Sequence, residues 1–108
     1  MRLILEYENS DGYTFSCTNT IPVVYESAEK FLVDLMDLAL KAIEAKGDGE
    51  FKIAGHTFSG AHFYHYVNAE DLDHRHLKYV MISSDHYLPV NPSVYTVDEW
   101  FVQAEKNQ

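Results

Sequence analysis

The segment Ser27–Gly47, which reads SAEKFLVDLMDLALKAIEAKG, predicts a long amphipathic helix. Ser27 carries the side-chain oxygen that is typical of a helix N-cap. Gly47 is a residue type that commonly ends a helix, and basic residues precede it, as the negative end of the helix dipole favours. We therefore expect a helix that begins at about Ser27 and ends near Lys46.

The apolar face of this helix is too wide for one sheet to cover. Projected at about 100° per residue, its apolar side chains spread over roughly 240°, whereas a helix lying on a sheet needs little more than about 100°. The polar remainder is a stripe, and we expect its Asp37 and Lys41 to pair at i,i+4 spacing. A second element must therefore pack on the helix. The apolar residues are Phe31, Leu32, Val33, Leu35, Met36, Leu38, Leu40 and Ile43.

The C-terminal segment predicts the element that completes this packing. Thr96 and Glu99 have the spacing of a capping box, which marks the start of a helix. We expect this short helix to pack on the first helix around Val33, Met36 and Leu40. Its apolar stripe consists of Val97, Trp100, Phe101 and Ala104.

The first residues of the chain predict a β-hairpin. Leu3, Leu5 and Tyr7 alternate with polar residues, and a second apolar row of Tyr13, Phe15 and Cys17 follows a turn containing Asp11-Gly12. We expect the apolar row of the second strand to lie in the core, so that Cys17 is a buried thiol that packs as a small hydrophobic residue rather than a nucleophile.

Further strands are predicted between the two helices. Residues 50–58 and 61–67 are expected to be extended, and residues 76–84 show the clearest alternation, with Leu77, Tyr79 and Met81 on one face and Lys78, Val80 and Ile82 on the other. The order predicts one α+β domain over residues 1–108. Its elements are a hairpin, a long helix, two to three further strands and a short C-terminal helix, with an antiparallel-rich sheet of about five strands.

Charge and composition exclude several classes of function. The 108 residues contain 8 Lys and Arg against 17 Asp and Glu, so the formal charge is −9. Nucleic-acid binding and docking on an anionic membrane both depend on clustered basic residues, and we expect neither. No apolar stretch approaches the length of about 20 residues that spans a membrane. The single cysteine cannot form an intrachain disulfide, which favours a cytoplasmic location.

The sequence favours a non-enzymatic protein with no cofactor and no metal. Its six His lie at positions 56, 62, 65, 74, 76 and 86, but they match no strong ligand spacing. The alternative that stays open is a small His-dependent enzyme or metal-binding domain. Its site would combine His62 or His65 with His74, His76 and an aspartate.

Two groups of carboxylates are candidates for binding a partner. A loop places one apolar residue among three carboxylates, an arrangement that suits an interface anchor with a charged rim. The second candidate is the acidic part of the first helix. The candidate residues are Glu70, Asp71, Leu72 and Asp73 in the loop, and Asp34, Asp37 and Glu44 on the helix.

These observations lead to the hypothesis of a small acidic module that binds and blocks a basic surface of a protein partner. Inhibitors, toxin-immunity proteins, phage-encoded anti-defence proteins and DNA mimics share this size and charge, as bulk properties only. A homodimer through leftover apolar surface on the first helix is compatible with this hypothesis.

Overall fold

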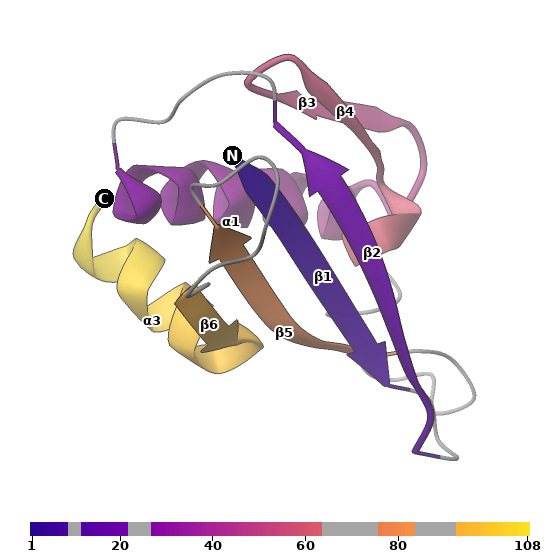
Figure 1. Cartoon of the computed structure of the whole chain (residues 1–108). Helices are drawn as coiled ribbons and strands as arrows, with labels where there is room; N and C mark the ends of the chain where they lie inside the picture. The colour runs from indigo at the N-terminus through magenta and orange to yellow at the C-terminus, as the bar shows by residue number, and fades with distance from the viewer. Residues whose placement is uncertain (9–11, 22–26, 64–75, 84–92) are drawn as a thin grey trace.

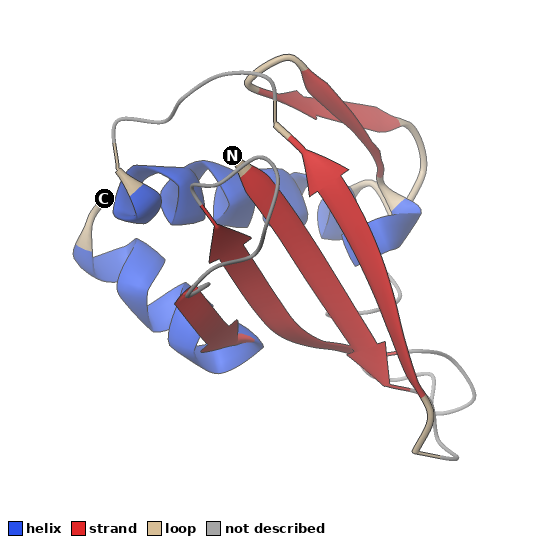
Figure 2. Ribbon diagram, viewed as in Figure 1, coloured by secondary structure: helices blue, strands red, loops and turns tan. Residues whose placement is uncertain are grey.

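The computed structural model describes residues 1–8, 12–21, 27–63, 76–83 and 93–108. It confirms the α+β class: helices lie behind a twisted antiparallel sheet, and a small hairpin lies beside that sheet (Figures 1 and 2). The strands form a four-stranded sheet of order β2-β1-β5-β6 and a two-stranded sheet β3-β4, rather than one sheet of about five. The elements are β1 (Arg2–Glu8), β2 (Thr14–Thr20), α1 (Ala28–Glu44), β3 (Glu50–Ile53), β4 (His56–Ser59), β5 (His76–Ser83), β6 (Ser93–Thr96) and α3 (Val97–Lys106).

Both helices begin at the predicted caps. The Ser27 side chain accepts a hydrogen bond from the Lys30 N–H at 3.1 Å. At the start of α3, the Thr96 hydroxyl accepts from the Glu99 N–H at 3.1 Å, and the Glu99 carboxylate accepts from the Thr96 N–H at 3.3 Å. The capping box is therefore confirmed in both directions.

The end of α1 is a Schellman motif. The Gly47 N–H donates to the Ala42 carbonyl at 2.8 Å, and the Lys46 N–H donates to the Ile43 carbonyl at 3.0 Å. Lys46 takes the left-handed conformation with a φ of 56°, a place where glycine is the usual residue. The predicted end of the helix is confirmed, and Lys46 rather than Gly47 is the first residue in the left-handed conformation.

The wide apolar face of α1 is covered from two sides, by the sheet and by α3. Trp100 of α3 is fully buried, and its indole N–H donates to the main-chain carbonyl of Leu32 at 2.9 Å. The predicted packing of the two helices is thus confirmed, although Leu40 stays 47% exposed. The buried residues of α1 are Phe31, Leu32, Val33, Leu35, Met36, Leu38, Ala39 and Ala42.

A β-bulge changes which side of β5 faces the core. Glu6 pairs with Tyr79 and Tyr7 pairs with Leu77, so Lys78 is an extra residue opposite β1. The phase of the side chains changes at this point, so Leu77 is buried with Val80 and Ile82, and the prediction that it shares a face with Tyr79 and Met81 is wrong. The buried apolar residues of β5 are Leu77, Val80 and Ile82.

The segment after α1 differs from its predicted form. Residues 50–58, expected as one strand, fold into β3 and β4 around a turn at Ala54 and Gly55, whose φ angles are 49° and 81°. Residues 61–63, expected to be extended, are helical, and residues 64–67 lie outside the described part of the chain. A Cβ on Gly60 would lie 3.0 Å from the carbonyl atoms of Gly47, so the two backbones approach closely there.

The β1–β2 hairpin is confirmed, but its second apolar row is only partly covered. Phe15 pairs with Tyr7 and Cys17 pairs with Leu5, so the row lies on the core face of the sheet. Because β2 is at the edge, however, Phe15 is 38% exposed, Tyr13 is 68% exposed and Cys17 is half-buried. The prediction that this row is fully buried is wrong, since the described elements that pack on the core face of the sheet leave part of β2 exposed.

Candidate functional site

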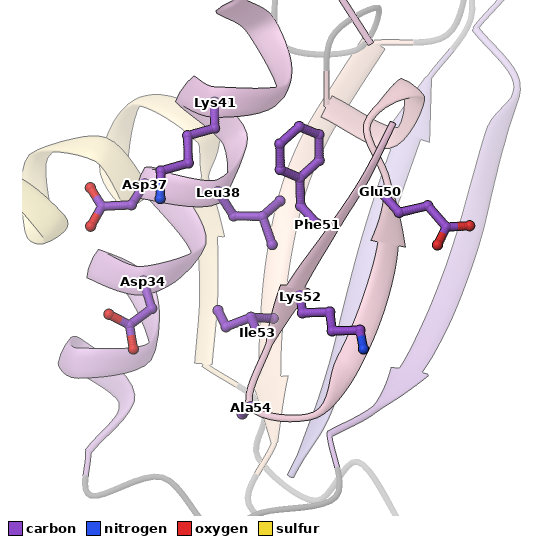
Figure 3. A pocket seen from close by; sticks show the side chains of 9 residues that line it. All are labelled: Asp34, Asp37, Leu38, Lys41, Glu50, Phe51, Lys52, Ile53 and Ala54. Carbon is purple, nitrogen blue, oxygen red and sulfur yellow. The ribbon is translucent and has the colours of Figure 1, made fainter. Parts of the chain in front are cut away.

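The acidic side of α1 borders a groove that β3 closes on the other side (Figure 3). Its volume is about 480 Å³. We call it the α1–β3 groove. It is lined by Asp34, Asp37, Leu38 and Lys41 of α1, and by Glu50, Phe51, Lys52, Ile53 and Ala54.

The groove has an apolar floor because side chains alternate along β3. Phe51 and Ile53 point toward α1 and meet Leu38 there, whereas Glu50 and Lys52 point the opposite way (Figure 3). Ile53 and Leu38 are buried, and Phe51 packs against the core cluster. The charged groups therefore form a rim around a floor that belongs to the hydrophobic core.

The rim carries charges of both signs. Its three carboxylates stand against the two ammonium groups of Lys41 and Lys52, which leaves a net charge of −3 + 2 = −1. Asp34 is half-buried and also accepts from Lys30 at 3.1 Å, the ion pair that the helix forms at i,i+4 spacing. Such an ion pair near the surface contributes less than about 1 kcal/mol to the stability of the fold. It nevertheless reduces the negative charge that Asp34 presents to the groove. The groove is a mixed surface rather than an acidic one.

The acidic side of α1 continues from the groove rim to Glu44. Asp37 and Glu44 are exposed, and Leu40 lies three residues after the first and four before the second. Helical spacing places all three on one strip of the helix surface. We call this strip the Asp37–Leu40–Glu44 surface. Leu40 lies on one side of the two carboxylates and the exposed Lys41 on the other, four residues after Asp37 and three before Glu44, and Asp37 is also part of the groove rim.

The predicted helix residues are thus separated by the structure. Asp34 and Asp37 both line the groove, where Asp34 also pairs with Lys30, whereas Glu44 lies outside it on the exposed strip that begins at Asp37. The prediction missed Leu40 as part of the candidate site, because it treated this residue as cover for α3. In the sequence, the position of Leu40, three residues after Asp37 and four before Glu44, indicates that the three residues share one strip of the helix. The other predicted site, Glu70, Asp71, Leu72 and Asp73, lies outside the described residues.

Two of the six histidines are described with their side chains, and both pack against Phe58. The ring centroids of His56 and His62 lie 4.5 Å and 6.3 Å from that of Phe58. His56 Nε2 donates to the Asn19 side-chain oxygen at 3.0 Å, and His62 Nδ1 donates to the Ser59 carbonyl at 3.2 Å. Within the described ranges, no three or more His, Cys, Asp or Glu side chains come together to hold a metal ion. Of the other histidines of the alternative site, His65 and His74 lie outside those ranges, and only the backbone of His76 is described, at the start of β5.

A separate charged pair lies at the β-bulge. Lys78 Nζ donates to a carboxylate oxygen of Glu8 at 2.5 Å. This hydrogen bond, together with the negative charge of Glu8, raises the pKa of the Lys78 ammonium above its ordinary value. The pair joins β1 to the extra residue of β5.

Comparison of the chain with protein-family models, with curated proteins and with solved structures gives no match. Over the described ranges, neither α1 nor α3 has the length and apolar character that crossing a bilayer requires.

Proposed function

We propose that this protein is a small, acidic, non-enzymatic module that binds and blocks a basic surface of a protein partner in the cytoplasm. The observation that carries the proposal is the Asp37–Leu40–Glu44 surface, which presents an exposed apolar side chain beside two exposed carboxylates. Interfaces commonly combine a central apolar contact with a polar rim.

The scaffold beneath this surface supports the proposal. The opposite side of α1 is packed against the sheet and α3, so the two carboxylates are attached to a helix that binding does not have to order. Carboxylates in this setting accept bidentate hydrogen bonds from Arg. A formal charge of −9 also steers a basic partner toward the protein from a distance.

The two other hypotheses have less support. The described histidines engage Asn19, Ser59 and Phe58 rather than one another, so no contact among them favours metal-dependent chemistry. A homodimer through α1 has little apolar surface to use, because α3 and the sheet cover the wide face and Leu40 is the large apolar side chain of α1 that stays exposed.

A matched pair of charge reversals tests the proposal. Glu44→Lys changes the proposed surface, and Glu105→Lys makes the same change at an exposed position in the last turn of α3, so that the effect of each on its own helix dipole is similar. The tagged proteins are used to capture partners from host lysate at low and at high salt. The captured protein is then purified, and its affinity for each variant is measured by calorimetry.

We expect a partner whose capture weakens at high salt. Adding Asp37→Lys to Glu44→Lys should weaken binding by about 1–3 kcal/mol and flatten its salt dependence, whereas Glu105→Lys should change the affinity little. Equal affinities for the Glu44 and Glu105 variants would exclude the Asp37–Leu40–Glu44 surface as the site. A wild-type protein that captures nothing in a salt-dependent way would contradict the proposed function itself.

A further inference from the structure

Over the described residues, one of the two edges of the main sheet lacks several features that normally prevent further strand pairing, although Asn19 near its end contacts His56 of β4. β2 forms this edge and β6 forms the opposite one, and over the described residues β2 pairs with β1 alone (Figure 1). It is seven residues long, and its sequence, TFSCTNT, contains no charge and no proline. Its register with β1 continues without a bulge from one end to the other. Natural edge strands are usually protected by such features, so an edge that lacks them can bind another strand.

The hydrogen bonds at one end of the hairpin show which groups face that edge. Ile21 N–H donates to the Met1 carbonyl at 2.7 Å, and Met1 N–H donates to the Ile21 carbonyl at 3.2 Å. Hydrogen-bonded and non-hydrogen-bonded pairs alternate along an antiparallel ladder, so every second residue from Ile21 turns its backbone toward β1. The residues between them turn their backbone N–H and carbonyl groups to the outer edge. These residues are Thr14, Ser16, Thr18 and Thr20.

The outer face of the sheet places a carboxylate within reach of an added strand. Glu6 of β1 pairs with Ser16 and lies on the face opposite the buried Leu5 and Tyr7. A strand added to β2 would lie two strand spacings, about 10 Å, from β1. Ser16 is small, so a Lys or Arg side chain on the added strand can extend across it and meet the Glu6 side chain.

The core face of β2 offers a different contact. Phe15 and Tyr13 are exposed there because the edge strand extends beyond the cover of the core. Side chains of an added strand alternate between the two faces, as those of β2 do. Basic residues on one face and apolar residues on the other are therefore the pattern that fits this edge.

We propose that the free edge of β2 binds an extended segment of a partner in which basic and apolar residues alternate, by adding it to the sheet as a further strand. The net charge selects this occupant over a second copy, because two chains of charge −9 repel one another whereas a cationic segment is attracted. The inference rests on the proposed function in expecting a basic partner, but it uses a surface different from that of α1.

Binding of a synthetic peptide tests this inference. The labelled probe has the length of β2 and alternates Lys with Val, and its binding is followed by fluorescence anisotropy. The control peptide has the same sequence and charge but is N-methylated at alternate residues, which removes the N–H groups that would pair with β2. Thr18→Pro removes one outward N–H of β2 without touching the ladder to β1, and Thr18→Val keeps that N–H as its control.

We expect the Lys-Val peptide to bind wild-type protein and Thr18→Val alike. Thr18→Pro and the N-methylated peptide should each weaken binding by about tenfold or more, since one or more strand-pairing hydrogen bonds are lost. Glu6→Gln should also weaken it, whereas Glu44→Lys should bind the peptide nearly as wild type does. A result that excludes the α1 surface as the partner-binding site can therefore be distinguished from a result that excludes peptide binding at the β2 edge.

Three outcomes would overturn the inference. Equal binding of the plain and N-methylated peptides would show that charge alone attracts the probe, and this comparison uses only wild-type protein, so it does not depend on how Thr18→Pro folds. Equal binding of the peptide to a folded Thr18→Pro would place the probe elsewhere. A concentration-dependent dimer that Thr18→Pro abolishes, observed by analytical ultracentrifugation, would identify a second copy as the occupant.

Discussion

Trp100 of α3 and Leu32 of α1 are joined by a buried hydrogen bond of 2.9 Å from the indole Nε1 to the main-chain carbonyl oxygen. The donor comes from a side chain that is fully buried, and the acceptor comes from the interior of a helix. A buried indole N–H without a partner would be costly, so this contact fixes where α3 lies along α1 as well as which face it presents.

Replacing Trp100 separates the hydrogen bond from the packing. Trp100→Phe removes the N–H and part of the ring volume and should lower the free energy of unfolding by about 1–3 kcal/mol. Trp100→Ala should cost about 3–5 kcal/mol, because it leaves a cavity between the helices. Urea unfolding followed by circular dichroism measures both. A Phe variant as stable as wild type would show that the hydrogen bond adds nothing beyond packing.

Lys46→Gly should stabilise the protein. Lys46 has a φ of 56° at the end of α1, a conformation that is strained for a residue with a Cβ and free for glycine. We expect a gain of about 1 kcal/mol in the free energy of unfolding. Ala45→Gly is the control, since Ala45 has a φ of −80° and should lose stability on the same change. A loss of stability in both variants would contradict the conformational argument.

Gly60→Ala should destabilise the β3–β4 hairpin. The new Cβ would lie 3.0 Å from the carbonyl carbon and oxygen of Gly47 and from the Phe51 ring, so the backbone has to move. Overpacking of this kind costs about 1–3 kcal/mol. Gly49→Ala is a useful comparison, because that site has open space and only its φ of 89° opposes a side chain. Thermal unfolding of both variants distinguishes a steric clash from backbone strain.

The contact between Lys78 and Glu8 predicts a loss of stability at alkaline pH. The pKa of Lys78 is raised in the folded state, so its contribution is fully present below the ordinary pKa of lysine and disappears as the pH rises through the higher folded value. Lys78→Met removes this contribution, and the difference in urea midpoint between wild type and variant should shrink above a pH of about 10.5. A difference that stays constant to higher pH would mean that the pair does not stabilise the fold.

Leu40→Ala tests the apolar part of the proposed binding surface without disturbing the fold. Leu40 is 47% exposed, and alanine is a strong helix former, so we expect the unfolding free energy to change by no more than about 0.5 kcal/mol. The affinity for the captured basic partner should fall in the same variant, as measured by calorimetry. Unchanged affinity would leave Asp37 and Glu44 as a purely electrostatic site.

The helix ends and the first hairpin followed from neighbouring residues. Ser27 and the pair Thr96 and Glu99 satisfy backbone donors within three residues of themselves, so the sequence pattern contains both partners of each interaction. The excess apolar surface of α1 likewise predicted that a second helix would cover it. These features were predictable because each depends on spacing along the chain.

Other features depended on contacts between distant residues. The bulge at Lys78 exists only in the register between β1 and β5, and it places Leu77 on the buried face with Val80 and Ile82 instead of with Tyr79 and Met81. Asp34 and Asp37 follow the same helical pattern and both line the groove, yet Asp34 is half-buried and pairs with Lys30 while Asp37 is exposed. Sequence spacing places side chains on a face, but it does not state what covers that face.

The sequence by itself therefore determined the α+β class, the limits of the two helices, the net charge and the expectation of a basic partner. The tertiary structure alone decided which apolar residues remain accessible, and among the described ones these are Phe15 and Tyr13 at the sheet edge, Leu40 on α1, Val94 on β6 and Val102 on α3. The physical reason is that hydrogen bonding in caps and turns is local, whereas burial is set by the elements that pack from elsewhere in the chain.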